Sequence, residues 1–226
     1  MLCTEEIVRA NIRNRKGQRV YYLAKGDRLT SGARDYLTRE RIEILSPEQA
    51  RPERYRIPGG GYLEEKPEHM THLRDDVLVL KSHPVIAFRG KLDTLQAELI
   101  LGQLELPQEA KRLGEILELS RQLIRCDVMQ EPVSREKLCG FTEQELRSRS
   151  QFPQEYYGTA HFMPQASDGM VLARLNRLRT CVREAELAAA AAFADAEGNC
   201  TRPDILRAMN RMSSMVYIMM IENKNP

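Results

Sequence analysis

The sequence predicts a mainly α-helical protein, a helical bundle of about five helices preceded by a small β-α-β appendage. From Pro84 onward, apolar residues recur at spacings of three and four, which is the period of amphipathic helices. Before that point the apolar runs are short and strand-like, and prolines and glycines follow them. At 226 residues with 42% hydrophobic content, the chain can bury one substantial core and carry a small appendage.

The N-terminal region reads as a strand, a helix and a strand. Val20–Leu23 and Ile42–Leu45 are the apolar runs, and a capped helix begins near Thr30 between them. Prolines and glycines then interrupt the pattern at Pro47, Pro52, Pro58 and Gly59–Gly61. We therefore expect a domain boundary near residue 60, with residues 1–60 forming a small α/β unit and linker and residues 61–226 forming the helical domain.

Two bundle helices follow. The first begins near Pro84, and the second runs from Pro107 to the turn at Glu131–Pro132. The apolar stripe of the first helix consists of Phe88, Leu92, Leu95 and Leu99. The buried row of the second helix is predicted to be Leu113, Ile116, Leu117, Leu123, Ile124 and Val128.

Three more helices complete the predicted bundle. A short one begins at the capping box formed by Thr142 and Glu145. The longest runs from Ser167–Asp168 to Phe193, and its apolar face is Leu175, Leu178, Val182, Ala185 and Ala189. The last has Pro203 in its first turn, and its expected buried row is Leu206, Met209, Met212, Val216 and Met220.

Three of these helices carry a polar row beside the apolar face. The rows are Arg89, Asp93 and Gln96; Asn176, Arg179, Arg183 and Glu186; and Asn210, Ser213 and Tyr217. Because charged groups at a buried seam are costly without a partner, and because arginine binds phosphate with two parallel hydrogen bonds, we expect the rows to meet at one anion-binding pocket. The alternative is a solvated surface with ordinary helix ion pairs.

Composition narrows the classes of function. The 34 basic and 32 acidic residues leave a net charge of only +2, which does not favour nucleic-acid binding. The five scattered cysteines indicate a reducing compartment without disulfides. No secretory signal is recognised, and the longest apolar stretch, Met215–Ile221, is too short to span a membrane. We expect a cytoplasmic protein without a metal site, since His69, His72 and His83 lack a ligand that completes a recognised spacing.

Three ordered segments carry a family resemblance: His83–Ala97, Leu175–Glu186 and Met209–Ser214. Together they resemble the cobalamin adenosyltransferases, most closely the ethanolamine-utilisation branch. The similarity extends from about Lys66 to Ile221, with a weaker match over Leu29–Ile44. The resemblance implies an enzyme that uses ATP, Mg²⁺ and cobalamin, in which Co(I) attacks the 5′ carbon of ATP. It also implies a homo-oligomer, with a trimer favoured and ATP held between subunits.

The resemblance assigns roles residue by residue. Asp93 is similar to the aspartate that pairs with an arginine of the adjacent subunit, and Arg183 to that arginine. Arg179 and Glu186 match its charged neighbours in the same motif. The remaining expected nucleotide-binding residues are Thr71, Arg74, Lys81, Arg89 and Asn210, of which Lys81 matches a lysine that contacts the phosphates. Tyr156, Tyr157, His161 and Phe162 form an aromatic segment that could cover a flat corrin or seal a bundle end.

Two departures from the family pattern keep a rival interpretation open. Leu187 stands where relatives often carry a further arginine, and the segment from Arg56 to Lys66 lacks the cysteine cluster of many members of the branch. A non-catalytic carrier of corrinoid or nucleotide is therefore the alternative function, and a purely structural bundle is a third. If the chain is the enzyme, we expect a flavoprotein reductant and ethanolamine ammonia-lyase as partners, and an association with a bacterial microcompartment.

Overall fold

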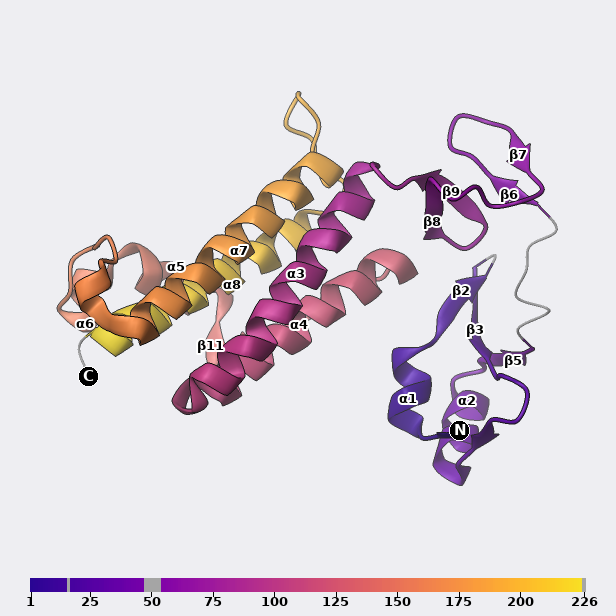
Figure 1. Ribbon diagram of the computed structural model, residues 1–226, viewed down its shortest axis with the longest axis horizontal. Helices are drawn as coiled ribbons and strands as arrows, with labels where there is room; N and C mark the ends of the chain where they lie inside the picture. Colours follow the sequence, from indigo (N-terminus) through magenta and orange to yellow (C-terminus); the bar gives the residue numbers. More distant parts are fainter. Residues whose placement is uncertain (16, 47–53, 225–226) are drawn as a thin grey trace. The chain divides into compact units, whose positions relative to one another are not determined.

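The computed structural model describes residues 1–15, 17–46 and 54–224, and the chain divides into two compact units, Met1–Lys81 and Ser82–Pro226 (Figure 1). The expected boundary near residue 60 lies within the first unit, and the assignment of domains stays a prediction. Pro47 and Pro52, which helped to predict that boundary, lie outside the described residues. Each unit is described by itself below.

The first unit begins with the predicted β-α-β arrangement. Strand β3 (Gln18–Tyr22) pairs in parallel with β5 (Glu43–Leu45), and helix α2 (Ser31–Arg39) connects them. The Thr30 hydroxyl caps α2 by accepting a hydrogen bond from the Ala33 N–H at 3.2 Å. The additional elements here, which the sequence analysis did not predict, are β1 (Leu2–Cys3), α1 (Glu5–Ala10), β2 (Arg13–Arg15) and β4 (Arg28–Leu29).

A second, four-stranded sheet ends the first unit. Its strand order is β7-β6-β9-β8, and its strands are β6 (Tyr55–Arg56), β7 (Tyr62–Leu63), β8 (Met70–Arg74) and β9 (Val77–Leu80). Strands β8 and β9 form an antiparallel hairpin whose turn holds Asp75 at φ 44°, a left-handed conformation that Asp tolerates better than most residues. Two of the predicted nucleotide-binding residues, Thr71 and Arg74, lie on β8, and a third, Lys81, directly follows β9.

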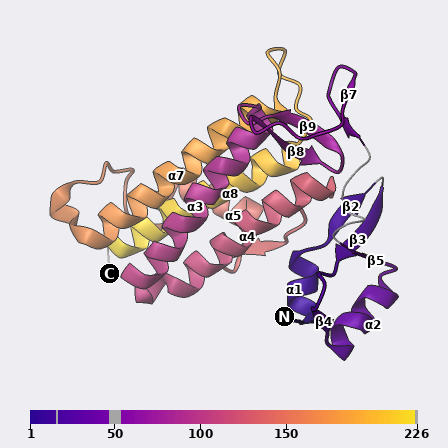
Figure 2. The same cartoon turned by 45° about the vertical axis from the view of Figure 1, so that its right-hand side comes forward.

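The second unit is the helical bundle. Its long helices are α3 (Pro84–Glu105), α4 (Ala110–Met129), α7 (Gly169–Phe193) and α8 (Pro203–Lys224). Helix α3 packs against both α4 and α7, and α7 packs against α8 (Figures 1 and 2). The shorter elements are η2 (Pro107–Glu109), β10 (Lys137–Leu138), β11 (Phe141–Thr142), α5 (Glu143–Gln151), α6 (Pro153–Tyr157) and η3 (Ala166–Asp168).

Local sequence signals explain where these helices begin and end. The Thr142 hydroxyl accepts from the Glu145 N–H at 3.3 Å while the Glu145 carboxylate accepts from the Thr142 N–H at 2.8 Å, which confirms the predicted capping box of α5. Pro84 occupies the first turn of α3, and the His83 imidazole accepts from the Val85 N–H at 3.2 Å. No helix within the described residues is long and apolar enough to cross a membrane.

The core of the bundle confirms most of the predicted rows. The α3 stripe from Phe88 to Leu99 is fully buried, as are the predicted residues of α7. Ile124, Val128 and Leu206 were expected in the core but are only half-buried. Near the end of α4, Cys126, Asp127 and Met129 are buried in place of Ile124 and Val128. In α8 the adjacent Ile205 is buried instead of Leu206.

Candidate functional site

One side of α7 is an ion-paired seam with α3. Arg174 and Arg177 both donate to the Glu98 carboxylate, and Arg174 also contacts Glu105 at 2.6 Å. Nearer the other end of the seam, Lys91 meets Glu184 at 2.9 Å. Hydrogen bonds from Arg174 hold the pKa of Glu98 below its ordinary value, although burial opposes this shift. The charges on this side are therefore satisfied within the chain.

The other side of α7 carries the predicted polar row, and its arginines lack acidic partners. The Arg179 guanidinium donates to the Asn176 side-chain oxygen at 2.9 and 3.2 Å, which is a neutral acceptor. Burial and the neighbouring charge of Arg183 lower the pKa of Arg179, against an opposing effect of Tyr217. Across residues 1–15, 17–46 and 54–224, neither Arg179 nor Arg183 has a carboxylate oxygen within 4.0 Å. Two cations thus lie side by side, one half-buried and one exposed.

A cavity of ≈ 370 Å³ lies beside Arg179, between α7, α8 and the segment that precedes η3. We call this segment, residues Gly158–Gln165, the aromatic loop. Arg179, Ser213 and Tyr217 line the cavity from the helices, and the loop contributes residues from His161 to Pro164. Ligand pockets commonly occupy about 300–1,000 Å³ and combine apolar walls with a few polar groups, so this cavity has the size and lining of a binding site.

The polar rows of α7 and α8 meet at this cavity, but the α3 row does not. The face of α3 that contacts α7 carries Lys91 and Glu98, whereas Arg89 donates to Asp127 of α4 at 2.8 Å. Asp93 is exposed and shares the Arg89 side of the helix by its spacing. Within the described part of this chain the α3 row therefore does not reach the cavity, and the convergence of all three rows on one pocket stays a prediction. Nothing in the α3 sequence predicts that Arg89 pairs with the buried Asp127 of α4.

The other residues predicted to bind nucleotide are divided between the units. Asn210 is exposed on α8, and its amide donates to the Leu206 carbonyl at 3.1 Å. Thr71, Arg74 and Lys81 belong to the first unit, where Thr71 and Arg74 lie on strand β8 and Lys81 follows β9. Lys81 lies at the open end of the β8–β9 hairpin, where its N–H donates to the His69 carbonyl at 3.0 Å. Their roles stay predictions.

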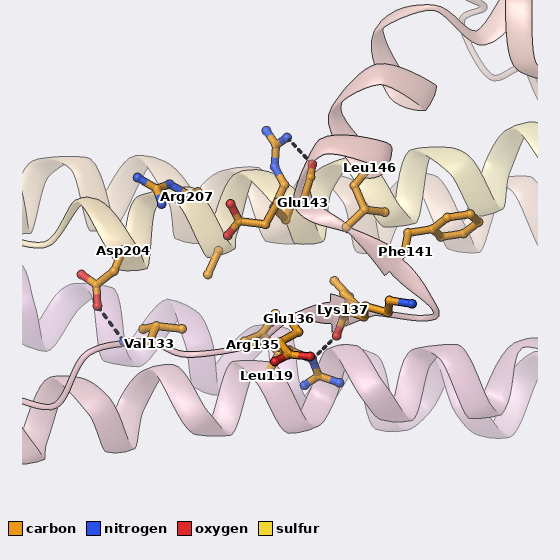
Figure 3. A pocket seen from close by; sticks show the side chains of 13 residues that line it. Leu119, Val133, Arg135, Glu136, Lys137, Phe141, Glu143, Leu146, Asp204 and Arg207 are labelled. Atoms are coloured by element: carbon orange, nitrogen blue, oxygen red, sulfur yellow. Dashed lines mark hydrogen bonds between the residues drawn. The ribbon is translucent and has the colours of Figure 1, made fainter.

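Glu186, the last residue of the α7 row, is half-buried and faces α8. Its charge acts on Arg211, whose pKa is lowered by burial and by Arg147, with Glu143 and Glu186 opposing. A smaller cavity of ≈ 70 Å³ lies near Arg211 between α4, α8 and the β10–β11 region (Figure 3). Figure 3 shows Asp204 accepting from the Val133 N–H at one end of it, and it is too small for a nucleotide or a corrin.

The histidines and aromatic residues have definite roles in the fold. His83 caps α3, and the His72 ring packs edge-on against Tyr55 with centroids 5.6 Å apart. Within the described residues, no group of three or more histidines, cysteines or acidic residues could hold a metal ion. Of the predicted aromatic segment, Tyr156 and Tyr157 belong to α6, because Pro153 starts a helical turn there. Ser150, Ser214 and Met163 also line the cavity, and the sequence did not predict them because each resembles an ordinary surface position.

Comparison with known proteins agrees with these observations. The chain is 35% identical to the corrinoid adenosyltransferase EutT of Salmonella typhimurium over 246 residues, which cover 96% of this chain and 90% of the relative. It is 39% identical to the corrinoid adenosyltransferase EutT of Escherichia coli K12 over 158 residues, which cover 70% of this chain and 59% of that relative. No solved structure matches the chain. A family model described as cobalamin adenosyltransferase matches residues 61–222, from strand β7 to the last helix, and this chain therefore belongs to the cobalamin adenosyltransferase family.

Proposed function

We propose that this chain transfers the 5′-deoxyadenosyl group of ATP to the cobalt of a reduced corrinoid, and that the product serves ethanolamine ammonia-lyase. The observation that carries the proposal is the pair Arg179 and Arg183, which lacks acidic partners in the described chain and adjoins a cavity of ≈ 370 Å³. Family membership supplies the reaction class. The expected setting, in the cytoplasm and associated with a microcompartment, stays a prediction.

The reaction needs no deprotonated side chain. Co(I) is the nucleophile: its electron pair forms the cobalt–carbon bond to C5′ of the ribose, and cobalt becomes formally Co(III). The bond between C5′ and its oxygen breaks, and the triphosphate leaves with that electron pair. A separate reductant, which we propose to be a flavoprotein, must supply the electron that converts Co(II) to Co(I). The protein contributes geometry, charge and protection from water.

The two α7 arginines are suited to the leaving group. Arginine remains charged in proteins and donates parallel hydrogen bonds to phosphate oxygens. Because the Arg179 guanidinium is half-buried near a second cation, a polyanion relieves a repulsion that the free protein bears. We propose that Arg179 and Arg183 hold the triphosphate. Asn210, Lys81, Thr71 and Arg74 are the other residues that we propose to bind nucleotide. Arg89 pairs with Asp127 in this chain, and we propose that it supports the nucleotide-binding residues.

Mg²⁺ fits this arrangement as a companion of the nucleotide. The ion usually keeps several waters and takes phosphate oxygens together with one or two carboxylates, rather than an all-protein cage. Glu186 is the carboxylate of the α7 row and lies one turn from Arg183. We propose that Glu186 holds the ion with the triphosphate, where it would neutralise part of the phosphate charge.

We further propose that the site is completed between subunits of a cyclic oligomer, with a trimer favoured. Asp93 and Arg183 are both exposed, lie on different sides of the bundle, and have no ion-pair partner in the described part of the chain. A head-to-tail interface brings different surfaces of two copies together, so Asp93 of one copy can pair with Arg183 of the next.

Co-expression of two inactive variants tests this interface. Asp93→Ala and Arg183→Ala are each expected to abolish most activity as homo-oligomers. In mixed oligomers, about a quarter of the head-to-tail interfaces combine an intact aspartate with an intact arginine, so part of the activity should return. If the mixed oligomers form but stay inactive, the two residues do not act across an interface.

The direct test of the proposed function is an anaerobic assay with purified protein, MgATP and chemically reduced cobalamin. We expect light-sensitive adenosylcobalamin, measured by its absorbance before and after illumination, with triphosphate or its hydrolysis products released in equal amount. Reactions without ATP or without reductant are the controls. Binding of both substrates without product would contradict the proposal and favour a carrier of corrinoid or nucleotide.

A further inference from the structure

His161 connects the aromatic loop to two helices through both of its ring nitrogens. The Nε2 atom lies 3.2 Å from the Gln151 carbonyl oxygen, and the Nδ1 atom lies 2.9 Å from the Tyr217 hydroxyl. A carbonyl can only accept a hydrogen bond, so Nε2 must carry a proton. In the neutral ring Nδ1 is then the acceptor, and the Tyr217 hydroxyl donates to it. One imidazole thus links the end of α5 with the middle of α8.

Ring packing reinforces the same attachment. The His161 ring stacks on Tyr217 with centroids 5.7 Å apart and an interplanar angle of 11°. The next residue, Phe162, also stacks on Tyr217, at 6.1 Å and 29°. Lys224, at the end of α8, lies 4.3 Å from the Phe162 ring centroid. Tyr217 is therefore the residue of α8 that contacts both His161 and Phe162 of the aromatic loop.

Residues of the aromatic loop form one wall of the cavity beside Arg179. His161, Phe162, Met163 and Pro164 all line it, and they present aromatic, thioether and proline surfaces. Among the described residues that line the cavity, Arg179 is the only arginine, lysine or acidic residue. Lys224, which contacts the Phe162 ring, is ion-paired with Asp168 at 3.2 Å. An apolar wall suits the flat face or edge of a macrocycle rather than a triphosphate, which the arginines would take. The position of the aromatic loop should then affect binding of the corrinoid more than binding of ATP.

We propose that His161 is a positioning residue for the corrinoid. By joining the Tyr217 hydroxyl to the Gln151 carbonyl, its imidazole holds the aromatic loop against α8 so that the cavity wall is in place before the corrinoid binds. This inference rests on the proposed function. It requires no contact between the imidazole and cobalt, and no proton transfer during the reaction.

Three variants separate the hydrogen bonds from the ring. His161→Phe keeps a flat ring and loses both hydrogen bonds, whereas Tyr217→Phe loses only the hydroxyl. His161→Gln is the conservative variant, because its amide can donate to the Gln151 carbonyl and accept from Tyr217. Tyr62→Phe, which removes a hydroxyl from an exposed tyrosine in the first unit, is the matched control. Each variant is assayed as full-length protein with KM determined separately for reduced cobalamin and ATP.

We expect His161→Phe and Tyr217→Phe each to raise the KM for the corrinoid by about fivefold or more, the effect of losing one useful hydrogen bond. The kcat and the KM for ATP should change by less than about twofold. The double variant should be no worse than His161→Phe alone, because that variant already lacks the bond that Tyr217→Phe removes. His161→Gln should recover most of the loss, and Tyr62→Phe should match the wild type.

Amide hydrogen exchange of Gly158–Gln165 in the ligand-free protein provides a readout that does not depend on activity. Exchange should be faster in His161→Phe than in the wild type, because the loop is released. Faster exchange in a protein whose wild type forms no adenosylcobalamin would overturn the proposed function but leave the attachment intact. An active wild type whose variants show unchanged corrinoid KM would overturn the positioning role, whether or not exchange rises. A fall in kcat alone, with a lower unfolding temperature, would indicate a merely structural histidine and would also overturn it.

Discussion

The arginines on the two long sides of α7 differ in their partners. On the side that faces α3, Arg174 and Arg177 both donate to Glu98, and the charges cancel within the chain. On the side that borders α8, Arg179 finds only the neutral oxygen of Asn176, and burial near Arg183 lowers its pKa. The two sides belong to the same helix and have similar composition. Their difference therefore comes from the neighbouring helices.

This difference separates structural charges from functional ones. A paired charge has already recovered the solvation it lost, so it gains little from a ligand. A cation that is partly removed from water without an anionic partner destabilises the folded protein. Such groups are typical of functional sites, where an anionic ligand offsets that destabilisation. The buried Arg89–Asp127 pair and the Arg202–Asp204 pair belong to the first class. We propose that Arg179 belongs to the second class, with the exposed Arg183 as its neighbouring cation, and the following predictions test that division.

The largest effect is expected from Arg183→Ala. If Arg183 stabilises the leaving triphosphate, its removal should lower kcat/KM for adenosyl transfer by about 10³-fold, as for other charge-stabilising donors. Glu184→Ala is the matched control, because Glu184 is the next residue and pairs with Lys91 on the α3 side. It should retain activity within about threefold of the wild type. Comparable losses in both variants, with circular dichroism unchanged, would remove the distinction between the two sides of α7.

The next effect is on stability and concerns the paired class. Asp127→Ala leaves Arg89 without its carboxylate in a site where the two side chains are only 4% and 15% exposed. Losing one partner of a buried pair should lower the free energy of unfolding by about 3 kcal/mol. Glu118→Ala on the same helix removes an exposed pair with Arg121 and should cost less than about 1 kcal/mol. Urea unfolding at pH 7 measures both, and equal costs would show that burial does not distinguish these pairs.

The helices of this protein could be predicted because their signals are local. The α3 stripe, the Thr142–Glu145 capping box and Pro203 each act within a turn or two of the chain. The β6–β9 sheet could not be predicted in the same way. Its order places β6 beside β9, although β7 and β8 lie between them in the sequence, and two of its strands have only two residues. Pairing of that kind depends on distant residues rather than on a pattern within the strand.

The candidate site was predictable to a similar extent. The spacing of Arg179 and Arg183 placed both on one side of α7, and the structure agrees. The pairing of Arg89 with Asp127, a residue 38 positions away in the chain, could not be predicted from spacing within α3. Likewise, Arg177 is ion-paired because Glu98 of α3 lies beside it, whereas Arg179 has no acidic partner among the described residues. Spacing within one helix predicts which side chains share a face, but their partners depend on the neighbouring helix.

A third prediction concerns pH and the pair Arg202–Asp204. Hydrogen bonds from Arg202 and the Val133 N–H lower the pKa of Asp204 from 3.8 to about 2. Because the folded-state pKa is depressed, this carboxylate contributes stability above pH 4, and the contribution is lost as pH falls through 2. The shift corresponds to about 2 kcal/mol at neutral pH.

Asp204→Asn tests this directly. At pH 7 it should lower the free energy of unfolding by about 2 kcal/mol, and it should flatten the decline in stability between about pH 4 and pH 2. The exposed Glu136→Gln, close to the same cavity, should leave stability within about 0.5 kcal/mol of the wild type. If the free energy of unfolding of Asp204→Asn falls between pH 4 and pH 2 as steeply as that of the wild type, the Arg202–Asp204 pair does not contribute to stability as proposed.

The smallest effect, and the sharpest comparison, is expected from Arg177→Ala set beside Arg179→Ala. Both remove an arginine from the middle of α7, but Arg177 is 51% exposed and its partner is Glu98 at 3.2 Å. Exposed ion pairs contribute little, and Arg174 still satisfies Glu98, so the unfolding midpoint and kcat/KM of Arg177→Ala should stay close to the wild type.

Arg179→Ala should instead lower kcat/KM strongly while leaving the protein at least as stable, because it removes a half-buried cation that repels Arg183. Loss of activity together with unchanged or increased stability is the signature of a residue kept for a ligand. If Arg179→Ala unfolds the bundle and Arg177→Ala abolishes activity, then the paired side of α7 is the functional one. The division of charges argued above would then have to be reversed.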